Sequence, residues 1–476
     1  MFIRLISWIL LGGLLHGQNY VPSREKVPMV PREFRAAWVA SVFNIDWPSK
    51  KGMSASSQQA EMKKILDKMM SMRMNAIIFQ VRPNADALYQ SRLEPWSHWV
   101  SGTQGKSPGY DPLAYCIQQA HARGIEVHAW FNPFRALPSD KIATAKNHVT
   151  RTHPGVIKRF KTYRWMDPSN SFTQQRALGT IMDVVSRYDI DGVHIDDYFY
   201  PYPDVGKNGE PKQIFPDGKS PAARRAVTDA FVQRMYRSVK QKKPWVRVGI
   251  SPFGIWRPGV PAGTTASIDS YRHLSADSRK WLANGWCDYM SPQLYWRIKG
   301  PQSYTALLAW WRAQGKRPVW PGIAASRIQS SEDPGRPASE ITNQVAYSRS
   351  IGRNYVGQVF WSMKSLMQNR GGISDGLTKN FYQQAALVPP MPWISNKAPG
   401  PPSVQAQRVS NGVSVAWSSV AGCSKYAVQA RYGKQWVFVY ATPGKKATLR
   451  GTPDAIAVSA VDRYGNCSNP AILSRK

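Results

Sequence analysis

Short apolar runs alternate with longer segments of helical periodicity through most of this 476-residue chain. The alternation begins near Glu33 and repeats eight times. Apolar runs of this length are typical of strands in a parallel sheet, because both faces of such a sheet are covered. The eight runs are FRAAWVASVF (34–43), NAIIFQV (75–81), IEVHAWF (125–131), DGVHID (191–196), VRVGIS (246–251), CDYMSPQLYW (287–296), RPVWPGIA (317–324) and YVGQVFWS (355–362).

The segments between these runs predict helices. Within residues 58–72, Met62, Ile65, Leu66 and Met69 recur at i, i+3, i+4 and i+7 and therefore share one helical face. Eight strand–helix alternations in series predict a (β/α)8 TIM barrel, with a doubly wound parallel sheet as the alternative. Further helices are expected over residues 111–124, 170–188, 221–240 and 337–352.

The N-terminus has the pattern of an export signal. It reads MFIRLISWILLGGLLHGQNY, in which a basic residue precedes an apolar stretch and a small-residue exit near Gly17. This predicts a signal peptide at residues 1–17 and an exported protein, periplasmic or secreted, without a lipid-anchor cysteine. The stretch is short for a transmembrane span. Polar, Pro-containing residues 18–31 predict a tether to a barrel over residues 32–387.

A different pattern begins after the barrel. Residues 388–400 are Pro-rich and predict a linker. In residues 401–476, alternating runs such as VSVAWSSV and YAVQARY show no helical period, which predicts a small β-sandwich. Trp417, Tyr426 and the closing VSAVDRYGNCS are similar to the pattern of a fibronectin type III module.

The composition adds a strong positive charge. The formal net charge is +34, which favours association with anionic partners. No helix-turn-helix, zinc-finger, RNP or KH signature is present, so nucleic acid is not the expected partner. An anionic cell envelope or membrane surface fits this charge, and a merely solvated cationic surface is the alternative.

The four cysteines do not form a metal-binding pattern. Cys116 and Cys287 lie in separate parts of the predicted barrel, whereas Cys423 and Cys467 both fall in the C-terminal domain. The latter two would suit a disulfide in an oxidising compartment, although the sequence leaves their pairing open. No CxxC motif or His/Cys cluster indicates a metal, and no cofactor is expected.

Polar and aromatic residues collect where the eight predicted strands end. In a barrel of this kind the active site lies at the C-terminal ends of the strands. Tryptophan faces stack on sugar rings, while amide and guanidinium groups bind sugar hydroxyls, so this mixture predicts a glycan groove rather than core packing alone. The residues at these ends are Asn44, Asp46, Arg82, His128, Trp130, Asn132, Arg135, His194, Asp196, Asp197, Tyr198, Ser251, Trp256, Arg257, Gln293, Tyr295, Trp296, Arg297, Arg327 and Trp361.

The fourth run, DGVHID, carries the main catalytic candidate. A period of two places His194 and Asp196 on one side of the strand. We expect Asp196 to point into the site with His194 beneath it, and the pair to keep Asp196 ionised as a nucleophile or charge stabiliser. A pair that merely closes the barrel is the alternative. Asp197 is expected to take part in catalysis, bind a substrate hydroxyl or cap the following loop.

Glycoside hydrolysis needs a second carboxyl group. Glu94 is the predicted proton donor, because Trp96 and Trp99 beside it would desolvate it and raise its pKa. An ion pair with Arg92 is the alternative for Glu94. Asp46 is the reserve candidate, and Asp288 lies early in its strand, which predicts a structural role.

Taken in order, the motifs resemble the glycosyl-hydrolase-like family 10, a group of exported bacterial barrel proteins. The resemblance implies a TIM barrel that acts on glycans, and some members are connected with cleavage of peptidoglycan strands that lack stem peptides. The matching motifs are REFRAAWVASVFNIDWPS (32–49), FQVRPNADALYQS (79–91), LEPWSHWVSG (93–102), GIEVHAWFNPFR (124–135), DGVHIDDYFYPYP (191–203), VGISPFGIWR (248–257), CDYMSPQLYW (287–296) and PGIAASR (321–327).

The fourth run also resembles the corresponding motif of the α-amylase clan. In that clan the aspartate at the place of Asp196 is the nucleophile, and an arginine stands where this chain has His194. The clan's acid is a glutamate at the end of the fifth strand, which VRVGISPFGIW lacks. Only the role of Asp196 therefore transfers.

Three functions are compatible with the sequence. The first is a glycoside hydrolase with a two-carboxylate mechanism, acting on peptidoglycan glycan or a related amino-sugar polymer. Arg82, Arg135, Arg257, Arg297 and Arg327 would then meet the carboxylates of muramyl groups. The second is a glycan-binding envelope protein without turnover. The third, a polysaccharide deacetylase, lacks a metal triad.

Overall fold

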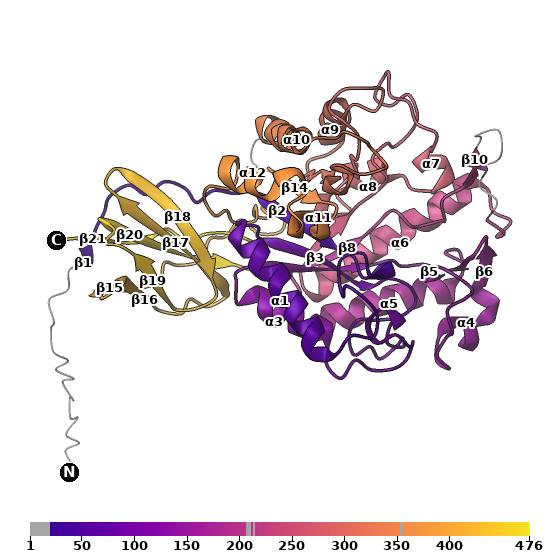
Figure 1. The fold of residues 1–476 in the computed structure, drawn as a ribbon, viewed down its shortest axis with the longest axis horizontal. Coiled ribbons are helices and arrows are strands. Elements are labelled where there is room, and N and C mark those ends of the chain that lie inside the picture. Colours follow the sequence, from indigo (N-terminus) through magenta and orange to yellow (C-terminus); the bar gives the residue numbers. More distant parts are fainter. Residues whose placement is uncertain (1–19, 206–210, 213–214, 353–355) are drawn as a thin grey trace, which may run out of the picture.

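The computed structural model describes residues 20–205, 211–212, 215–352 and 356–476. The signal peptide predicted at residues 1–17 lies outside this range. Two bodies lie side by side: a barrel surrounded by helices and a smaller β domain (Figure 1). Among the described residues, no helix is both long and apolar enough to cross a membrane.

The predicted barrel is confirmed. Each of the eight apolar runs contains one strand, and all eight pair in parallel in the order β12-β11-β8-β4-β3-β2-β14-β13. Parallel bridges from Met290 to Val319 and from Gln293 to Gly322 join the two ends of this sheet. The strands are β2 (Phe34–Val39), β3 (Ala76–Arg82), β4 (Glu126–Phe131), β8 (Gly192–Ile195), β11 (Arg247–Ile250), β12 (Tyr289–Met290), β13 (Gly322–Ile323) and β14 (Gly357–Phe360).

The helices pack around this sheet as their periodicity predicts. Helix α1 buries Met62, Ile65, Leu66 and Met69, the residues that share its apolar face. Side-chain caps fix the starts of the long helices, and the Asn170 carboxamide accepts two backbone N–H groups at the start of α5. The main helices are α1 (Ala55–Ser71), α3 (Pro112–His121), α5 (Ser171–Arg187), α6 (Pro221–Lys242), α8 (Ser278–Ala283), α9 (Tyr304–Arg312), α10 (Ala338–Ile351), α11 (Met363–Met367) and α12 (Ile373–Asn380).

Short elements follow the C-terminal ends of the barrel strands and form its rim. After β4, the strands β5, β7 and β6 make a small antiparallel sheet, which lies at the end of the molecule opposite the β domain (Figure 1). The rim elements are η1 (Val42–Asn44), α2 (His98–Ser101), β5 (Arg135–Leu137), α4 (Val149–Thr152), η2 (Pro154–Val156), β6 (Ile157–Phe160), β7 (Tyr163–Met166), β9 (Asp204–Val205), β10 (Pro211–Lys212), α7 (Ser270–His273), η3 (Ala325–Arg327) and η4 (Arg370–Gly372).

The C-terminal domain is all-β, with antiparallel pairing throughout. One sheet has the order β15-β16-β19, and the other has the order β1-β21-β20-β17-β18. Trp417, Tyr426 and Val458 lie in the core between them. The similarity to fibronectin type III modules stays a prediction. The strands are β15 (Val404–Val409), β16 (Gly412–Trp417), β17 (Cys423–Tyr432), β18 (Gln435–Thr442), β19 (Lys446–Arg450), β20 (Ala455–Asp462) and β21 (Ala471–Arg475).

The tether predicted at residues 18–31 is corrected by the structure. Within it, β1 (Tyr20–Pro22) pairs antiparallel with β21 and extends the larger sheet of the β domain. The Tyr20 ring is buried in that domain's core, and its hydroxyl donates a hydrogen bond of 2.6 Å to the Pro453 carbonyl. An edge strand offers unpaired backbone groups, which this segment satisfies. The chain therefore reaches the barrel from the β domain.

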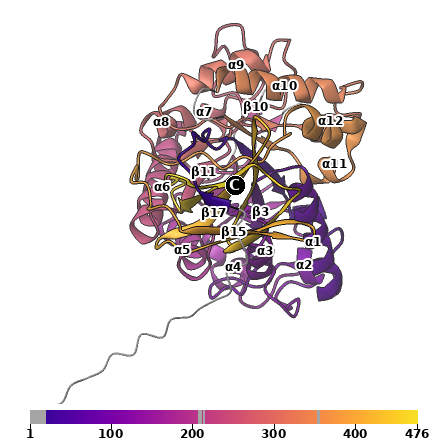
Figure 2. The ribbon, with the colours of Figure 1, turned by 90° about the vertical axis from the view of Figure 1, so that its left-hand side faces the viewer.

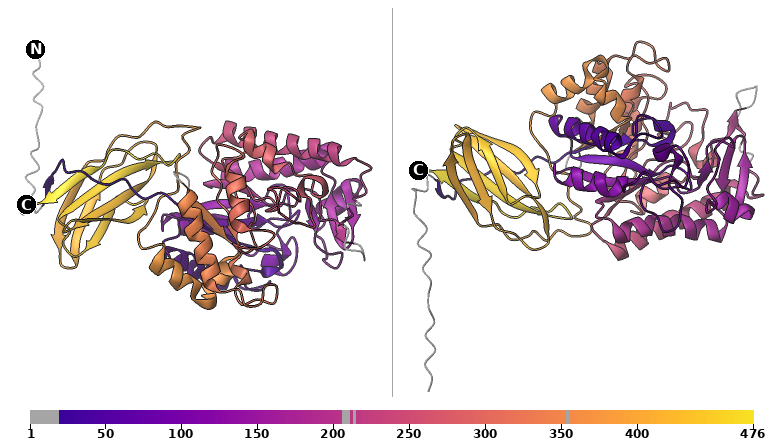
Figure 3. Two further views of the ribbon diagram at one scale, coloured as in Figure 1. Left: turned by 90° about the horizontal axis from the view of Figure 1, so that it is seen from above. Right: turned by 60° about the horizontal axis from the view of Figure 1, so that its bottom comes forward.

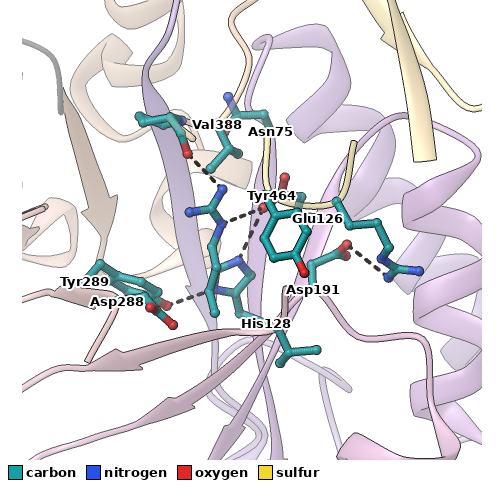
Figure 4. A network of polar contacts seen from close by, with 12 residues as sticks. Asn75, Glu126, His128, Asp191, Asp288, Tyr289, Val388 and Tyr464 are labelled. Carbon is teal, nitrogen blue, oxygen red and sulfur yellow. Dashed lines mark hydrogen bonds and ion pairs between the residues drawn. The ribbon is translucent and has the colours of Figure 1, made fainter. Parts of the chain in front are cut away.

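The β domain docks against the N-terminal ends of the barrel strands. Lys425 of β17 lies 2.9 Å from the Glu126 carboxylate at the start of β4, and Arg463 lies 2.5 Å from Asp189 just before β8. Cys423 and Cys467 are both free thiols, and Cys467 accepts a hydrogen bond from Arg32. Figure 4 shows the polar network at this end of the barrel. The β domain lies at this end of the barrel and away from the opposite rim (Figures 2 and 3).

Candidate active site

Asp196 lies directly after β8, at the C-terminal end of the barrel. Its carboxylate accepts hydrogen bonds from the Trp130 indole N–H (3.1 Å), from the Asn132 amide (3.3 Å) and from the backbone N–H of Tyr198 (3.3 Å). The residue is 5% exposed. Strand β4, which pairs with β8, supplies Trp130, and Asn132 follows that strand directly. Asp196 is therefore buried and oriented by neutral hydrogen-bond donors.

Asp197 is held by a different set of donors. The Tyr202 hydroxyl donates to one of its oxygens, and the Gln293 amide donates to the other at 3.0 Å. Gln293 comes from the loop that follows β12, so the Asp197 carboxyl is held from another side of the barrel. Among the described residues, neither Asp196 nor Asp197 forms an ion pair with a cation. The two carboxyls therefore lack the partner that usually compensates a buried charge.

Burial and mutual repulsion shift the titration of this pair. Burial raises the pKa of Asp196 to about 7, and the charge of Asp197 contributes to the increase. Burial also raises the pKa of Asp197. Because burial disfavours a charged carboxylate, both groups are easier to protonate than an ordinary aspartate. With its pKa raised to about 7, Asp196 can hold a proton close to neutral pH.

The predicted pairing of His194 with Asp196 is wrong. His194 is fully buried, and its Nε2 accepts a hydrogen bond of 3.1 Å from the Trp38 indole. Because an indole can only donate, the proton of His194 is on Nδ1, which donates to the Tyr289 hydroxyl at 3.0 Å. Burial holds the pKa of His194 well below its usual range. A neutral histidine cannot keep Asp196 ionised, so the prediction of an ionised nucleophile is withdrawn.

His128 is also part of the barrel core rather than a substrate contact. Its Nδ1 accepts from the same Tyr289 hydroxyl at 2.8 Å, and the side chain is fully buried. Tyr289 thus links the two histidines inside the barrel, and Figure 4 shows its contact with His128. The sequence did not indicate this role, because a tyrosine early in the sixth strand has no signal that distinguishes it from ordinary core packing.

Glu94 is not available as the predicted proton donor. Its two carboxylate oxygens lie 2.8 and 2.5 Å from Nε and Nη2 of Arg82, and the side chain is 1% exposed. The partner is Arg82 rather than the expected Arg92. A general acid must present a proton to the substrate, whereas both oxygens of this carboxylate bind one guanidinium. The prediction that Arg82 binds substrate is also wrong, because Arg82 is fully buried.

The ion pair supports the site indirectly. Nη1 of Arg82 donates to the backbone carbonyl of Asn132, and the backbone N–H of Asn132 donates to the Arg82 carbonyl at 2.9 Å. The Asn132 amide in turn donates to Asp196. Glu94 and Arg82 therefore fix Asn132, which in turn orients the Asp196 carboxyl.

Asp46 and Asn44 hold the rim together rather than face a substrate. The Asp46 carboxylate accepts from Ser362 Oγ (2.6 Å), from the Lys364 backbone N–H (2.7 Å) and from the Ala40 backbone N–H (2.9 Å). Burial raises its pKa to about 6. The Asn44 amide donates to two backbone carbonyls at 2.9 Å. Both residues were predicted to bind substrate, and their polar groups are instead committed to neighbouring loops.

Aromatic residues surround the carboxyl pair on several strands. The ring centroids of Trp130 and Trp361 are 6.2 Å apart, and those of Trp361 and Trp38 are 6.1 Å apart. The Arg135 guanidinium lies 4.9 Å from the centre of the Tyr198 ring. Burial raises the pKa of Tyr295, and the negative charges of Asp197 and Asp196 add to the increase. Tyr202 and Trp38 were missed, although the aromatic run YFYPYP and the period of two in β2 could have indicated them.

Trp256 and Arg257 lie in a separate aromatic cluster. Trp256 stacks with Trp310 at 6.0 Å and donates its indole N–H to Asp277 at 3.2 Å. Arg257 forms an ion pair of 3.2 Å with Asp269. Trp296 contacts Phe253 at 5.7 Å, beside Gln293. The structure therefore brings together Trp130, Asn132, Arg135, Tyr198, Gln293, Tyr295 and Trp361 around the pair, and leaves Trp256 and Arg257 with these other partners.

The raised pKa of Asp196 predicts a pH-dependent penalty on folding. Its pKa is about 7 in the folded state, above the value near 4 expected for an unfolded chain, so its contribution to stability is lost as the pH rises through 7. Asp196→Asn removes this titration. The variant should therefore gain stability relative to wild type as the pH rises from 5 to 8, as measured by urea unfolding. A difference that does not change with pH would contradict the assignment.

Comparison with known proteins gives one family and several relatives. Residues 33–333 match the family described as Glycosyl hydrolase-like 10. Glycosyl hydrolase YngK of Bacillus subtilis (strain 168) is 40% identical over 396 residues, covering 78% of this chain and 76% of YngK. Glycosyl hydrolase DigH of Escherichia coli (strain K12) is 32% identical over 321 residues, covering 61% of this chain and 73% of DigH.

Solved structures with a similar fold include the PgaB (BpsB) glycoside hydrolase domain from Bordetella bronchiseptica. Its TM-score is 0.47 at 13% identity, over 73% of this chain and 98% of that domain. The endo-1,4-beta-mannanase from Rhizomucor miehei has a TM-score of 0.47 at 14% identity, over 76% of this chain and 99% of the mannanase.

Proposed function

Because the chain belongs to the Glycosyl hydrolase-like 10 family, we propose that it is an exported enzyme that hydrolyses glycosidic bonds in the glycan strands of peptidoglycan. One observation carries this proposal. The barrel holds two adjacent carboxyl groups, Asp196 and Asp197, at the end where barrel enzymes act, and neither has a cation partner among the described residues. A buried, uncompensated pair of this kind is unfavourable for folding and fits an acid that must hold a proton near neutral pH.

The pair divides the chemical work. Protonated Asp196 donates its proton to the glycosidic oxygen as the bond to the anomeric carbon breaks. Ionised Asp197, fixed by Tyr202 and Gln293, supplies negative charge that stabilises the oxocarbenium-like transition state. The oxygen of a water molecule then bonds to the anomeric carbon, and one of its protons passes to the Asp196 carboxylate, which restores the acid. This assignment reverses the roles expected from sequence, because Asp196 becomes the acid.

Arg135 supports a substrate that carries carboxylates. Of the five arginines expected at the mouth, Arg82 is buried against Glu94, while Arg257, Arg297 and Arg327 form ion pairs with acidic residues. Arg135 has no ion pair among the described residues, although it is 4% exposed and its Nε and Nη2 both donate to the Pro83 carbonyl. Its charge acts on the pKa of Asp196. A guanidinium that lacks a carboxylate partner beside the acid fits the lactyl carboxylate of a muramyl group.

The net charge of +34 and the N-terminal signal pattern support export to an anionic envelope. The second candidate function is glycan binding without turnover. It is favoured by one observation, namely that Arg82 occupies the carboxylate of Glu94, which had been expected to act as the acid.

One assay separates the two functions. Purified protein is incubated with peptide-free peptidoglycan glycan strands, and released reducing ends are followed by mass spectrometry. Hydrolysis by wild type supports the enzyme, whereas binding to the strands without release of reducing ends supports the second candidate. Asp67→Asn is the matched control for Asp196→Asn in this assay, because Asp67 is an exposed residue of α1 that pairs with Arg123.

A further inference from the structure

Phe43 is an exposed aromatic residue on the rim of the barrel. It belongs to η1, the turn that follows β2, and 57% of its surface is accessible to solvent. Its backbone φ is 55°, and that of the next residue, Asn44, is 52°. Bulky side chains rarely adopt this left-handed conformation, which persists only where the surroundings fix it. An exposed phenyl ring on a strained turn is unfavourable for the free protein, and such features concentrate at ligand-binding sites.

The surroundings fix this turn from three sides. The Asn44 amide donates to the backbone carbonyls of Pro48 and Trp99 at 2.9 Å each. Asp46 binds the backbone N–H of Ala40 and thereby closes the turn. The Phe43 ring meets the Trp99 ring at 5.1 Å with an interplanar angle of 60°. Phe43 is therefore held outward in one orientation rather than left free to fold back.

The turn is continuous with the site of Asp196. Asp46 accepts a hydrogen bond of 2.6 Å from Ser362, the residue after Trp361. The Trp361 ring lies 6.2 Å from that of Trp130, whose indole donates to Asp196. These contacts connect the loops that follow β2 and β14 to Trp130 of β4 and to Asp196 after β8. The turn that carries Phe43 is therefore linked to the Asp196 site through these side chains, and both lie at the same rim of the barrel.

The chemistry of the side chain limits what it can bind. A phenyl ring has no hydrogen-bonding group, and its exposed face offers a flat apolar surface of the kind that stacks on the apolar face of a sugar ring. We propose that Phe43 is a stacking platform for a sugar ring of the bound glycan, several rings away from the bond that is cleaved. This inference rests on the proposed function only in taking a glycan as the ligand. It makes the protein prefer long strands to short fragments.

The test measures binding without turnover. In an Asp196→Asn background, dissociation constants are determined for peptide-free peptidoglycan glycan strands and for the disaccharide of N-acetylglucosamine and N-acetylmuramic acid. Phe43→Ala should weaken binding of the strands about fivefold to tenfold and leave binding of the disaccharide unchanged. Phe43→Gly should show the same loss, because it also removes the ring while relieving the backbone. Phe43→Trp should retain binding.

Tyr432→Ala provides the matched control, because Tyr432 is an aromatic residue of the β domain that is 39% exposed. Unchanged affinity of the strands in both Phe43→Ala and Phe43→Gly would overturn the platform, and so would an equal loss for strands and disaccharide. Binding that depends on Phe43, without release of reducing ends by wild type, would contradict hydrolysis and leave the platform standing. If the Asp196→Asn protein with Phe43 intact does not bind the strands, both proposals are contradicted.

Discussion

Asparagine in place of Asp196 is expected to lower kcat on peptide-free glycan strands about 10²- to 10⁴-fold, the usual contribution of a positioned general acid. Asparagine keeps the shape of the side chain, and its carbonyl oxygen can still accept from the Trp130 indole. It cannot donate a proton to the glycosidic oxygen. The loss should therefore fall on kcat, with KM little changed, as measured from the initial rate of reducing-end release.

Two comparisons make this result specific. Asp67→Asn, the same substitution on the exposed face of α1, should leave kcat unchanged. Circular dichroism should show the same fold in both variants. Activity of Asp196→Asn within a factor of three of wild type would show that another group supplies the proton.

The second large effect concerns stability. Glu94→Ala is expected to lower the free energy of unfolding by about 3–5 kcal/mol, because it leaves the fully buried Arg82 guanidinium without its carboxylate. The double variant Arg82→Met/Glu94→Leu also removes the buried Arg82 guanidinium and should recover much of this loss; Arg176, which lies 3.8 Å from Glu94, is 17% exposed and still donates to the Leu93 carbonyl. Urea unfolding of the wild type, the single variant and the double variant measures both steps.

A catalytic role for Glu94 predicts a different outcome. Glu94→Gln keeps the size of the side chain, and if Glu94 were the proton donor this variant would lose activity at nearly unchanged stability. If the role of Glu94 is structural, Glu94→Gln should lower stability. Activity should fall as a consequence, because Arg82 no longer fixes Asn132. A Glu94→Gln protein as stable as wild type but inactive would restore the original assignment.

The sequence predicted the barrel because its signal is local. Each strand is an apolar run, and the spacing of Met62, Ile65, Leu66 and Met69 alone places them on the buried face of α1. The period of two in DGVHID likewise places Asp196 at the C-terminal end of β8, pointing into the site. These features depend on neighbours in the chain, which a single sequence displays directly.

The side-chain partners could not be predicted, because they come from distant parts of the chain. Arg92 is two residues from Glu94, yet the structure pairs Glu94 with Arg82, which the barrel brings closer. His194 was expected beneath Asp196, and its partners are instead Trp38 and Tyr289 from the first and sixth strands. The raised pKa of Asp196 follows from burial and from the neighbouring charge of Asp197, neither of which the sequence displays. Residues 20–22 were likewise assigned to a tether, since nothing local indicated their pairing with β21.

The dependence of kcat/KM on pH, in wild type and in Asp197→Asn, tests the central claim most directly. If Asp196 acts as the acid, the wild-type profile falls as the pH rises through about 7, because Asp196 then loses its proton. Asp197→Asn removes the neighbouring charge that helps to hold the pKa of Asp196 high. The falling limb of the residual activity should therefore move to a lower pH than in wild type. A wild-type profile that rises through pH 7, or a limb that stays in place in Asp197→Asn, would contradict the role of Asp196 as the acid.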